Sequence, residues 1–178
     1  MKTSKSFLGI LIAAGMVIFL FGCEDFLNQA GVSVYSDYQS INVPIDAAPA
    51  GEYVFLNYME PLNLDSMMSA SGYQNVENVS LYEANLSLAD TSENQNFNSF
   101  KSFQILLSGN ELPEVIIAEL TDIPENVSNI NLNTIDIDLL QYMHGANYEL
   151  KIKGVLEEDL NSPIEIVGRM RYKVGFGF

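Results

Sequence analysis

Alternation between apolar and polar positions is clearest over the last fifteen residues of the chain. An apolar residue or a glycine stands at every second position from Ile164 to Phe176. Four of the five positions between them from 165 to 173 are charged: Glu165, Arg169, Arg171 and Lys173. Because successive side chains of a strand point to opposite faces, this pattern predicts a long strand with one buried and one solvated face.

Shorter stretches rich in aromatic and β-branched residues predict further strands, bounded by turn-forming residues. We place these strands near 41–46, 52–58, 79–88, 103–107, 130–137 and 148–156. Within 79–88 the apolar parity changes between Leu81 and Ala84, which indicates either a β-bulge or two short strands.

The stretch after Pro113 fits two kinds of element. Pro113 and Glu114 suit the start of a helix, whereas the β-branched run at 115–117 favours a strand. We favour the strand.

Two segments predict short helical turns. Asp65 and Asp138 suit the first position of a turn, and Gly72 and Gly145 suit its end. The surrounding segments, 64–72 and 137–145, echo each other at an offset of 73 residues. An internal duplication and chance recurrence of a capping pattern both explain this echo, and the sequence leaves the choice open.

Short strands separated by turn signals predict an all-β domain over residues 41–178, built as an antiparallel β-sandwich. An immunoglobulin-like topology is one option for it. The chain has no Trp and a single Cys, so the Cys…Trp…Cys pattern of true immunoglobulin domains is absent.

The N-terminal segment has a different composition. Lys2 and Lys5 precede an uncharged apolar run at 7–21. A basic start followed by an apolar run of this length predicts a secretory signal peptide, which we assign to residues 1–22. An uncleaved membrane anchor is the alternative.

The end of this leader, Leu20-Phe21-Gly22-Cys23, resembles the lipobox of bacterial lipoproteins, although Phe21 is larger than the usual second residue. The resemblance covers residues 1–23 only. It implies cleavage before Cys23 and attachment of acyl chains such as palmitate to its thiol. Two or three acyl chains hold a protein firmly to a membrane. Residues 23–40 would then be the lipidated cysteine and a tether to the domain.

Glu24 and Asp25 follow the cysteine at once. They are similar to the signals by which some bacteria, notably Bacteroidota, send lipoproteins to the cell surface, although any polar pair would also serve in a tether. The expected location is therefore the cell envelope, at the outer membrane. If Glu24 and Asp25 act as a sorting signal, the protein is exposed on the cell surface.

The charge of the chain excludes one class of partner. The net charge is −15, and removal of the leader leaves six basic against 23 acidic residues, a net charge of −17. Such a body repels nucleic acid at long range, so we expect no nucleic-acid partner.

Candidate catalytic chemistry is sparse. His144 is the only histidine, and a place at the end of a helical turn accounts for it. We expect no cofactor, no transition-metal site and no enzymatic activity. The chain has no second His to join His144 and no second Cys to join Cys23 as a metal ligand. An acidic turn at 157–161, with Glu157, Glu158 and Asp159, has the oxygen ligands of a calcium site but also suits a solvated hairpin.

Three functions from different classes remain. The leading hypothesis is a non-enzymatic, lipid-anchored envelope protein that binds a protein or a glycan, or serves as an accessory subunit. The stretch "GVSVYSDYQS" at 31–40 mixes Tyr, Ser and Gly as binding surfaces do. An integral outer-membrane barrel is the second, since the chain ends in alternating residues and Phe178. The third is an envelope enzyme that uses paired carboxylates.

Overall fold

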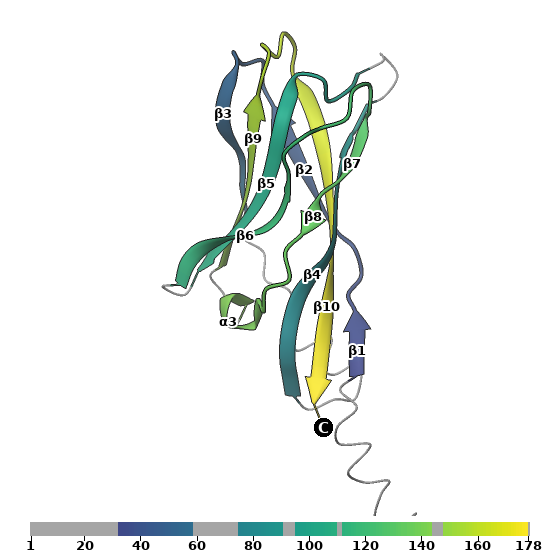
Figure 1. The fold of residues 1–178 in the computed structure, drawn as a ribbon, viewed down its shortest axis with the longest axis vertical. Helices are drawn as coiled ribbons and strands as arrows, with labels where there is room; N and C mark the ends of the chain where they lie inside the picture. The colour runs from purple at the N-terminus through teal and green to yellow at the C-terminus, as the bar shows by residue number, and fades with distance from the viewer. Residues whose placement is uncertain (1–31, 59–74, 91–94, 110–111, 144–147, 178) are drawn as a thin grey trace, which may run out of the picture.

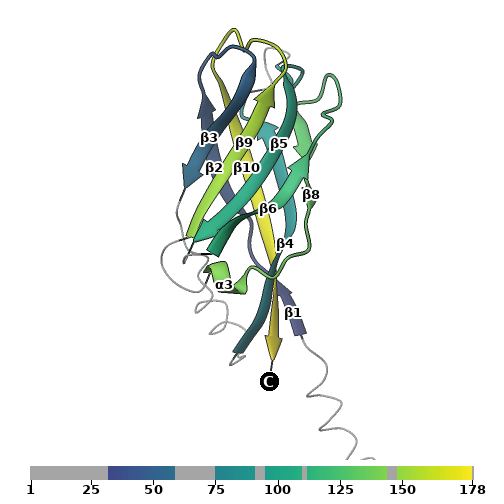
Figure 2. The ribbon, with the colours of Figure 1, turned by 60° about the vertical axis from the view of Figure 1, so that its left-hand side comes forward.

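Two antiparallel sheets face each other in the computed structural model of this chain (Figure 1). The structure describes residues 32–58, 75–90, 95–109, 112–143 and 148–177. Figure 2 shows the second sheet in front of the first. The predicted all-β sandwich is thereby confirmed.

The first sheet is built around the long C-terminal strand β10 (Ile164–Gly177). On one side β10 pairs with β4 (Asn75–Leu88), whose far side meets β7 (Asn129–Asn131). On its other side β10 pairs first with β2 (Gln39–Ile45) and then with β1 (Val32–Tyr35). The strand predicted from alternation therefore lies at the centre of a sheet.

The second sheet has the order β3-β9-β5-β6-β8. Its strands are β3 (Gly51–Tyr58), β9 (Tyr148–Leu156), β5 (Phe100–Gly109), β6 (Leu112–Leu120) and β8 (Asn133–Thr134). The stretch after Pro113 is thus the strand β6, as we favoured. A single turn of helix, α3 (Leu140–Met143), follows β8.

The strand order identifies the topology as that of a jelly roll. The last strand, β10, lies between β2 and β4, and β9 lies between β3 and β5. This interleaving of early and late strands is what two nested Greek keys produce. In an immunoglobulin domain the last strand instead occupies a sheet edge. The immunoglobulin-like option is therefore wrong.

The core fills the space between the sheets. Four aromatic rings meet on the second-sheet side, with Phe103 5.7 Å from Phe97 and 4.8 Å from Phe100 between ring centroids, and Phe55 beside them. Each such buried side chain contributes about 1.5–3 kcal/mol of hydrophobic stabilisation. From β10 the core receives Ile166, Met170, Tyr172, Val174 and Phe176. The alternating residues that also fitted an outer-membrane protein thus point into this core.

The parity change in the predicted strand at 79–88 is a β-bulge. Arg171 of β10 lies opposite Glu83, and the next residue, Tyr172, lies opposite Leu81. Tyr82 is the extra residue, so the strand continues while its inward positions change from odd to even numbers. A bulge allows this change without breaking the strand.

The predicted strand at 130–137 divides into two. β7 pairs with β4 of the first sheet, and β8 pairs with β6 of the second. Between them the buried Leu132 donates its backbone N–H to the carbonyl oxygen of Ala84 at 2.9 Å. The chain crosses from one sheet to the other here, which is why one alternating run serves two short strands.

Asp138 caps the helical turn as the sequence predicts. Its Oδ1 accepts hydrogen bonds from the backbone N–H groups of Leu140 at 3.0 Å and Val79 at 3.1 Å. The expected end of the turn at Gly145 and the partner segment 64–72 lie outside the described residues. The possible duplication is therefore not tested.

The expected tether at 23–40 extends too far toward the domain. Val32 pairs with Phe176 and Tyr35 pairs with Lys173, so the first sheet already includes β1. Val32 and Val34 are both partly buried, and Val34 packs against the core, which supplies the physical reason. The sheet therefore begins by Val32, ahead of the expected boundary at residue 41.

Candidate functional site

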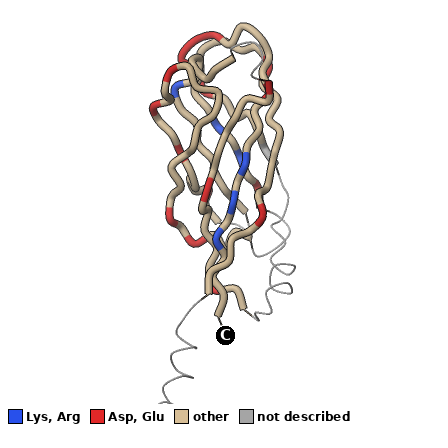
Figure 3. The backbone as a smooth tube through the Cα atoms, turned by 90° about the vertical axis from the view of Figure 1, so that its right-hand side faces the viewer, with Lys and Arg blue, Asp and Glu red and all other residues tan. Residues whose placement is uncertain are grey.

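The first-sheet outer face is the solvent side of β10 and its neighbours. Arg169, Arg171 and Lys173 alternate with the buried Met170 and Tyr172, so all three cations point outward. Figure 3 shows a line of basic positions running toward the C-terminal end. On a chain with a net charge of −15, such a line of cations is a local exception.

Ser36 organises the interruption between β1 and β2. Its backbone N–H donates to the carbonyl oxygen of Tyr172 at 2.9 Å, and its Oγ accepts from the backbone N–H of Tyr172 at 2.9 Å. The hydroxyl in turn donates to the carbonyl oxygen of Asp37 at 2.8 Å. Ser36 is buried, and these bonds satisfy polar groups that would otherwise destabilise the fold. The interruption is therefore held in place against β10 while the chain continues in the same direction from β1 to β2.

This interruption places two tyrosines around one arginine. The Arg171 guanidinium carbon lies 5.2 Å from the ring centroid of Tyr35 and 5.2 Å from that of Tyr38. Arg171 also donates from Nε to the carbonyl oxygen of Ser36 at 3.1 Å. Each exposed cation–π contact contributes about 0.5–1 kcal/mol. Arg171 is thus held in one position.

The bulge at Tyr82 completes the group. It directs both Tyr82 and Glu83 to the outer face, where a regular strand would direct only one of them. The Tyr82 and Tyr35 rings lie 4.5 Å apart, and the Tyr38 hydroxyl donates to Glu83 Oε2 at 2.7 Å. We call these five residues the tyrosine–arginine cluster: Tyr35, Tyr38, Tyr82, Glu83 and Arg171.

The hydrogen bond to Glu83 is the main reason why the pKa of Tyr38 is raised, while Arg171 acts in the opposite direction. The phenol therefore remains a protonated donor at neutral pH. The three tyrosines are nevertheless well exposed, at 42% for Tyr35 and 50% each for Tyr38 and Tyr82. Rings that are both exposed and fixed in place are suited to contact a partner.

Beside the cluster lies an open recess of about 470 Å³, which we call the amide recess. It is lined by Tyr38, Ser40, Glu83, Asn85, Asn129 and Arg169. Asn85 Nδ2 donates to the Oδ1 atoms of Asn129 and Asn131, each at 2.8 Å, and Asn129 Nδ2 donates back to Asn85 Oδ1 at 3.2 Å. The amides are therefore fixed by one another.

The guanidinium group of Arg169 has no partner in this recess. Arg169 is exposed and lies opposite Ser40 and Asn85 in the strand register, and its side chain makes no hydrogen bond or ion pair with any part of the chain that the structure describes. Its five N–H donors are available to an acceptor from outside the chain.

On the outer face of the second sheet, Lys151 and Lys153 form ion pairs with carboxylates. Lys151 Nζ lies 2.7 Å from Glu114 Oε2 and 3.3 Å from Glu149 Oε2, and Lys153 Nζ lies 3.8 Å from Glu114 Oε1. The hydrogen bond to Glu114 and then that to Glu149 raise the pKa of Lys151. Both lysines are thus neutralised within the chain.

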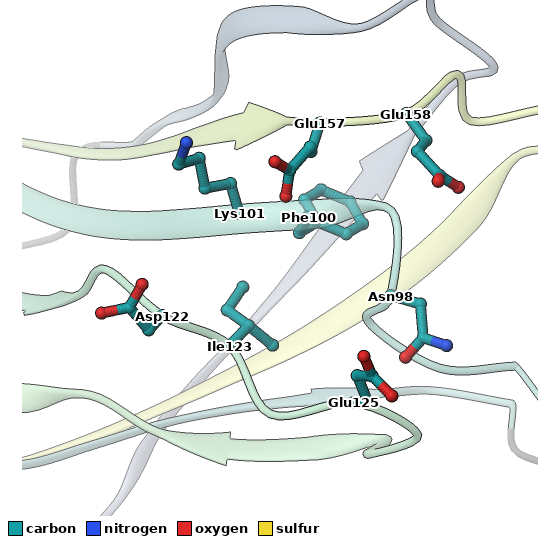
Figure 4. Close-up of a pocket in the computed structure, with 8 residues that line it drawn as sticks. All are labelled: Asn98, Phe100, Lys101, Asp122, Ile123, Glu125, Glu157 and Glu158. Carbon is teal, nitrogen blue, oxygen red and sulfur yellow. The ribbon is translucent and has the colours of Figure 1, made fainter.

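An acidic end pocket is formed by the start of β5 and by the segments that follow β6 and β9 (Figure 4). It encloses about 630 Å³ and is lined by Asn98, Phe100, Lys101, Asp122, Ile123, Glu125, Glu157 and Glu158. The structure separates the acidic turn expected at 157–161, because Asp159 instead accepts a hydrogen bond from the backbone N–H of Ala50 at 2.8 Å. Within the described ranges, no three His, Cys, Asp or Glu side chains are placed to hold a metal ion.

Sequence reasoning found part of this arrangement. The stretch 31–40 was singled out for its tyrosines, and Tyr35 and Tyr38 are indeed on the surface. Asn85, Asn129 and Arg169 were not expected to meet, since they come together only through strand pairing. The parity change at Tyr82 was the one signal in the sequence of a local irregularity. Cys23 and His144 lie outside the described residues.

Among the described residues, no helix has the length and apolar character needed to cross a membrane. No family model matches the chain, and no curated protein matches it. Among solved structures, it is similar to a chain from desmodium yellow mottle tymovirus, with 6% identity, a TM-score of 0.30 and coverage of 84% of each chain. The function must therefore be inferred from the side chains of this protein.

Proposed function

We propose that this protein is a non-enzymatic binding protein of the cell envelope, anchored by lipid on Cys23, which presents the first-sheet outer face to a partner. The observation that carries the proposal is the tyrosine–arginine cluster beside the uncommitted Arg169. Tyr and Arg are enriched among residues that dominate binding energy.

The cluster is organised before any partner arrives. Tyr38 is fixed by Glu83, Arg171 by Ser36, and the Asn85 amide by its neighbours on β7. A partner would therefore find side chains that have already lost most of their rotational freedom, which lowers the entropic cost of association.

The leader and the position of β1 support the anchor. Leu20, Gly22 and Cys23 give the lipobox-like sequence, and acidic residues follow it. Figure 1 shows β1 at the end of the sandwich opposite the connection between β9 and β10. An anchor ahead of Val32 would hold that end toward the membrane and leave the outer face of the sheet open to the side.

The anchor is tested by mass spectrometry of the mature N-terminus together with protease treatment of intact cells. We expect an acylated Cys23 on a protein that external protease removes. Cys23→Ser should release the protein from membranes, whereas the neighbouring Asp25→Asn should keep it there. An unmodified Cys23 on a protease-resistant protein would overturn the anchored proposal.

The binding face is tested by placing a photo-crosslinking amino acid at Tyr82, which is 50% exposed on the first sheet, or at Val54, which is 54% exposed on the second. We expect crosslinks to an envelope component from position 82 in intact cells and none from position 54. Equal crosslinking from both positions would contradict a dedicated binding face.

A further inference from the structure

The amide recess contains a cation that no carboxylate neutralises. Glu83 is the acidic residue that lines it, and Glu83 already accepts the hydrogen bond from Tyr38. Arg169, Arg171 and Lys173 stand in succession on β10, and the described part of the chain gives none of them an ion pair. Like charges in a row repel one another, so an anionic ligand would relieve this repulsion.

The position of Arg169 excludes one common way of binding a peptide. β10 is hydrogen-bonded to β2 on one side and to β4 on the other at this level of the sheet. Its backbone therefore has no free edge to which a further strand could add. At Arg169, a ligand is therefore recognised by the side chains that point out of the sheet.

Beside Arg169, the amide recess presents short polar side chains and one aromatic ring. Ser40 offers a hydroxyl, and Asn85 and Asn129 offer amide oxygens whose second lone pairs remain open. Arg171 lies over one face of the Tyr38 ring, and Tyr38 remains 50% exposed beside the recess, which leaves aromatic surface for a ligand. The hydroxyl groups of a sugar can form hydrogen bonds with these polar groups. The C–H face of the sugar ring can stack on the tyrosine ring. The volume of about 470 Å³ lies within the range of about 300–1,000 Å³ typical of small-ligand sites.

We propose that the amide recess binds a glycan that carries carboxylate groups, with Arg169 as the contact to the carboxylate, an inference that rests on the proposed binding role of this face. The planar guanidinium matches a carboxylate through two parallel hydrogen bonds. The amides and Ser40 then contact the hydroxyl groups of the same sugar or of its neighbour.

The test is binding of the full chain, purified in detergent, to an array of glycans that contain uronate or sialic acid residues beside neutral counterparts. We expect binding to the carboxylated members only. Arg169→Gln should weaken it by about tenfold to a hundredfold, the loss of a charged hydrogen-bonded contact. Lys153→Gln removes the same charge from the opposite face and should leave the affinity unchanged.

Two further comparisons identify the ligand chemistry. Methyl esterification of tetragalacturonic acid keeps the sugar but removes its charge, so the ester should bind at least about tenfold more weakly than the free acid. Arg169→Lys keeps the charge without the two-pronged donor and should recover only part of the affinity.

Several results would overturn the inference. Binding of no carboxylated glycan, equal binding of neutral and carboxylated glycans, or unchanged binding by Arg169→Gln would each do so. Competition by tetraglutamate peptide as strong as that by tetragalacturonic acid would assign the recess to acidic proteins instead. Crosslinking from Tyr82 without glycan binding would remove this inference alone, whereas glycan binding by a chain with unmodified Cys23 would remove only the anchored function.

Discussion

The two outer faces of the sandwich place cations in opposite surroundings. On the second sheet, Lys151 and Lys153 lie within 4 Å of Glu114 or Glu149 carboxylates. On the first, Arg171 lies between two tyrosine rings and Arg169 has no partner among the described residues. These two lysines are paired with carboxylates, whereas the two arginines have no carboxylate partner among the described residues.

This contrast separates solubility from recognition. Exposed ion pairs such as those of Lys151 are common on protein surfaces and add little to stability. The three tyrosines around Arg171 leave apolar ring surface in contact with water, which is unfavourable. The stability of the fold does not account for this exposure. The arrangement of partners around a charge therefore says more about function than the number of charges does.

The largest difference between the faces should appear in the loss of stability when a serine hydroxyl is removed from each. Ser36→Ala leaves the buried N–H of Tyr172 without an acceptor, so we expect a loss of about 2 kcal/mol in the free energy of unfolding. Ser108→Ala on the second sheet removes only a 3.4 Å contact to Glu149, and we expect a change within about 0.5 kcal/mol. Urea denaturation measures both. Equal losses would show that Ser36 has no special place.

A smaller difference should appear in how salt changes the coupling energy between a cation and its neighbour on each face. A double-mutant cycle between Arg171→Ala and Tyr35→Ala should give about 0.5–1 kcal/mol of coupling. Raising the salt from about 0.01 M to about 1 M shortens the Debye length from about 30 to 3 Å. We expect the Lys151–Glu114 coupling to vanish over this range and most of the Arg171–Tyr35 coupling to persist. Parallel loss of both would contradict the contrast.

The smallest expected effect concerns alkaline pH. The pKa of Lys151 is raised above its ordinary value of 10.5, so its pairs stabilise the fold fully below that pH. The contribution is then lost as the pH rises through the raised value. Lys151→Arg should remain charged and decline less between about pH 10 and 11.5, because the arginine pKa lies above about 12. Identical pH profiles from urea denaturation would show that Lys151 contributes nothing.

The fold was predictable where one residue pattern served one strand. Strict alternation located β10, aromatic and β-branched content located β9, and the parity change at Leu81–Ala84 marked the position of the bulge. The run at 130–137 was misjudged as one strand because alternation does not reveal which sheet a residue joins. The topology escaped prediction for the same reason, since strand order depends on pairings between residues far apart in sequence.

The candidate site was less predictable than the fold. Tyr35 and Tyr38 could be identified from composition, but Arg169 meets Asn85 only through pairing across 84 positions. The boundary at residue 41 was wrong because β1 has only four residues and its two valines are only partly buried, so its alternation is a weak signal. Weak patterns at a sheet edge become informative only when the neighbouring strand is known.

The antiparallel pairing of β1 with the end of β10 has a mechanical consequence. Val32 lies opposite Phe176, and the chain enters the sheet there along the axis of β1 (Figure 1). A pull applied through the residues before Val32 loads the β1–β10 hydrogen bonds in shear, so that they share the force instead of opening in turn. Forced unfolding is governed by the rate of such rupture. In the proposed anchored protein, such tension would reach Ser36 and Tyr38 before the rest of the sandwich.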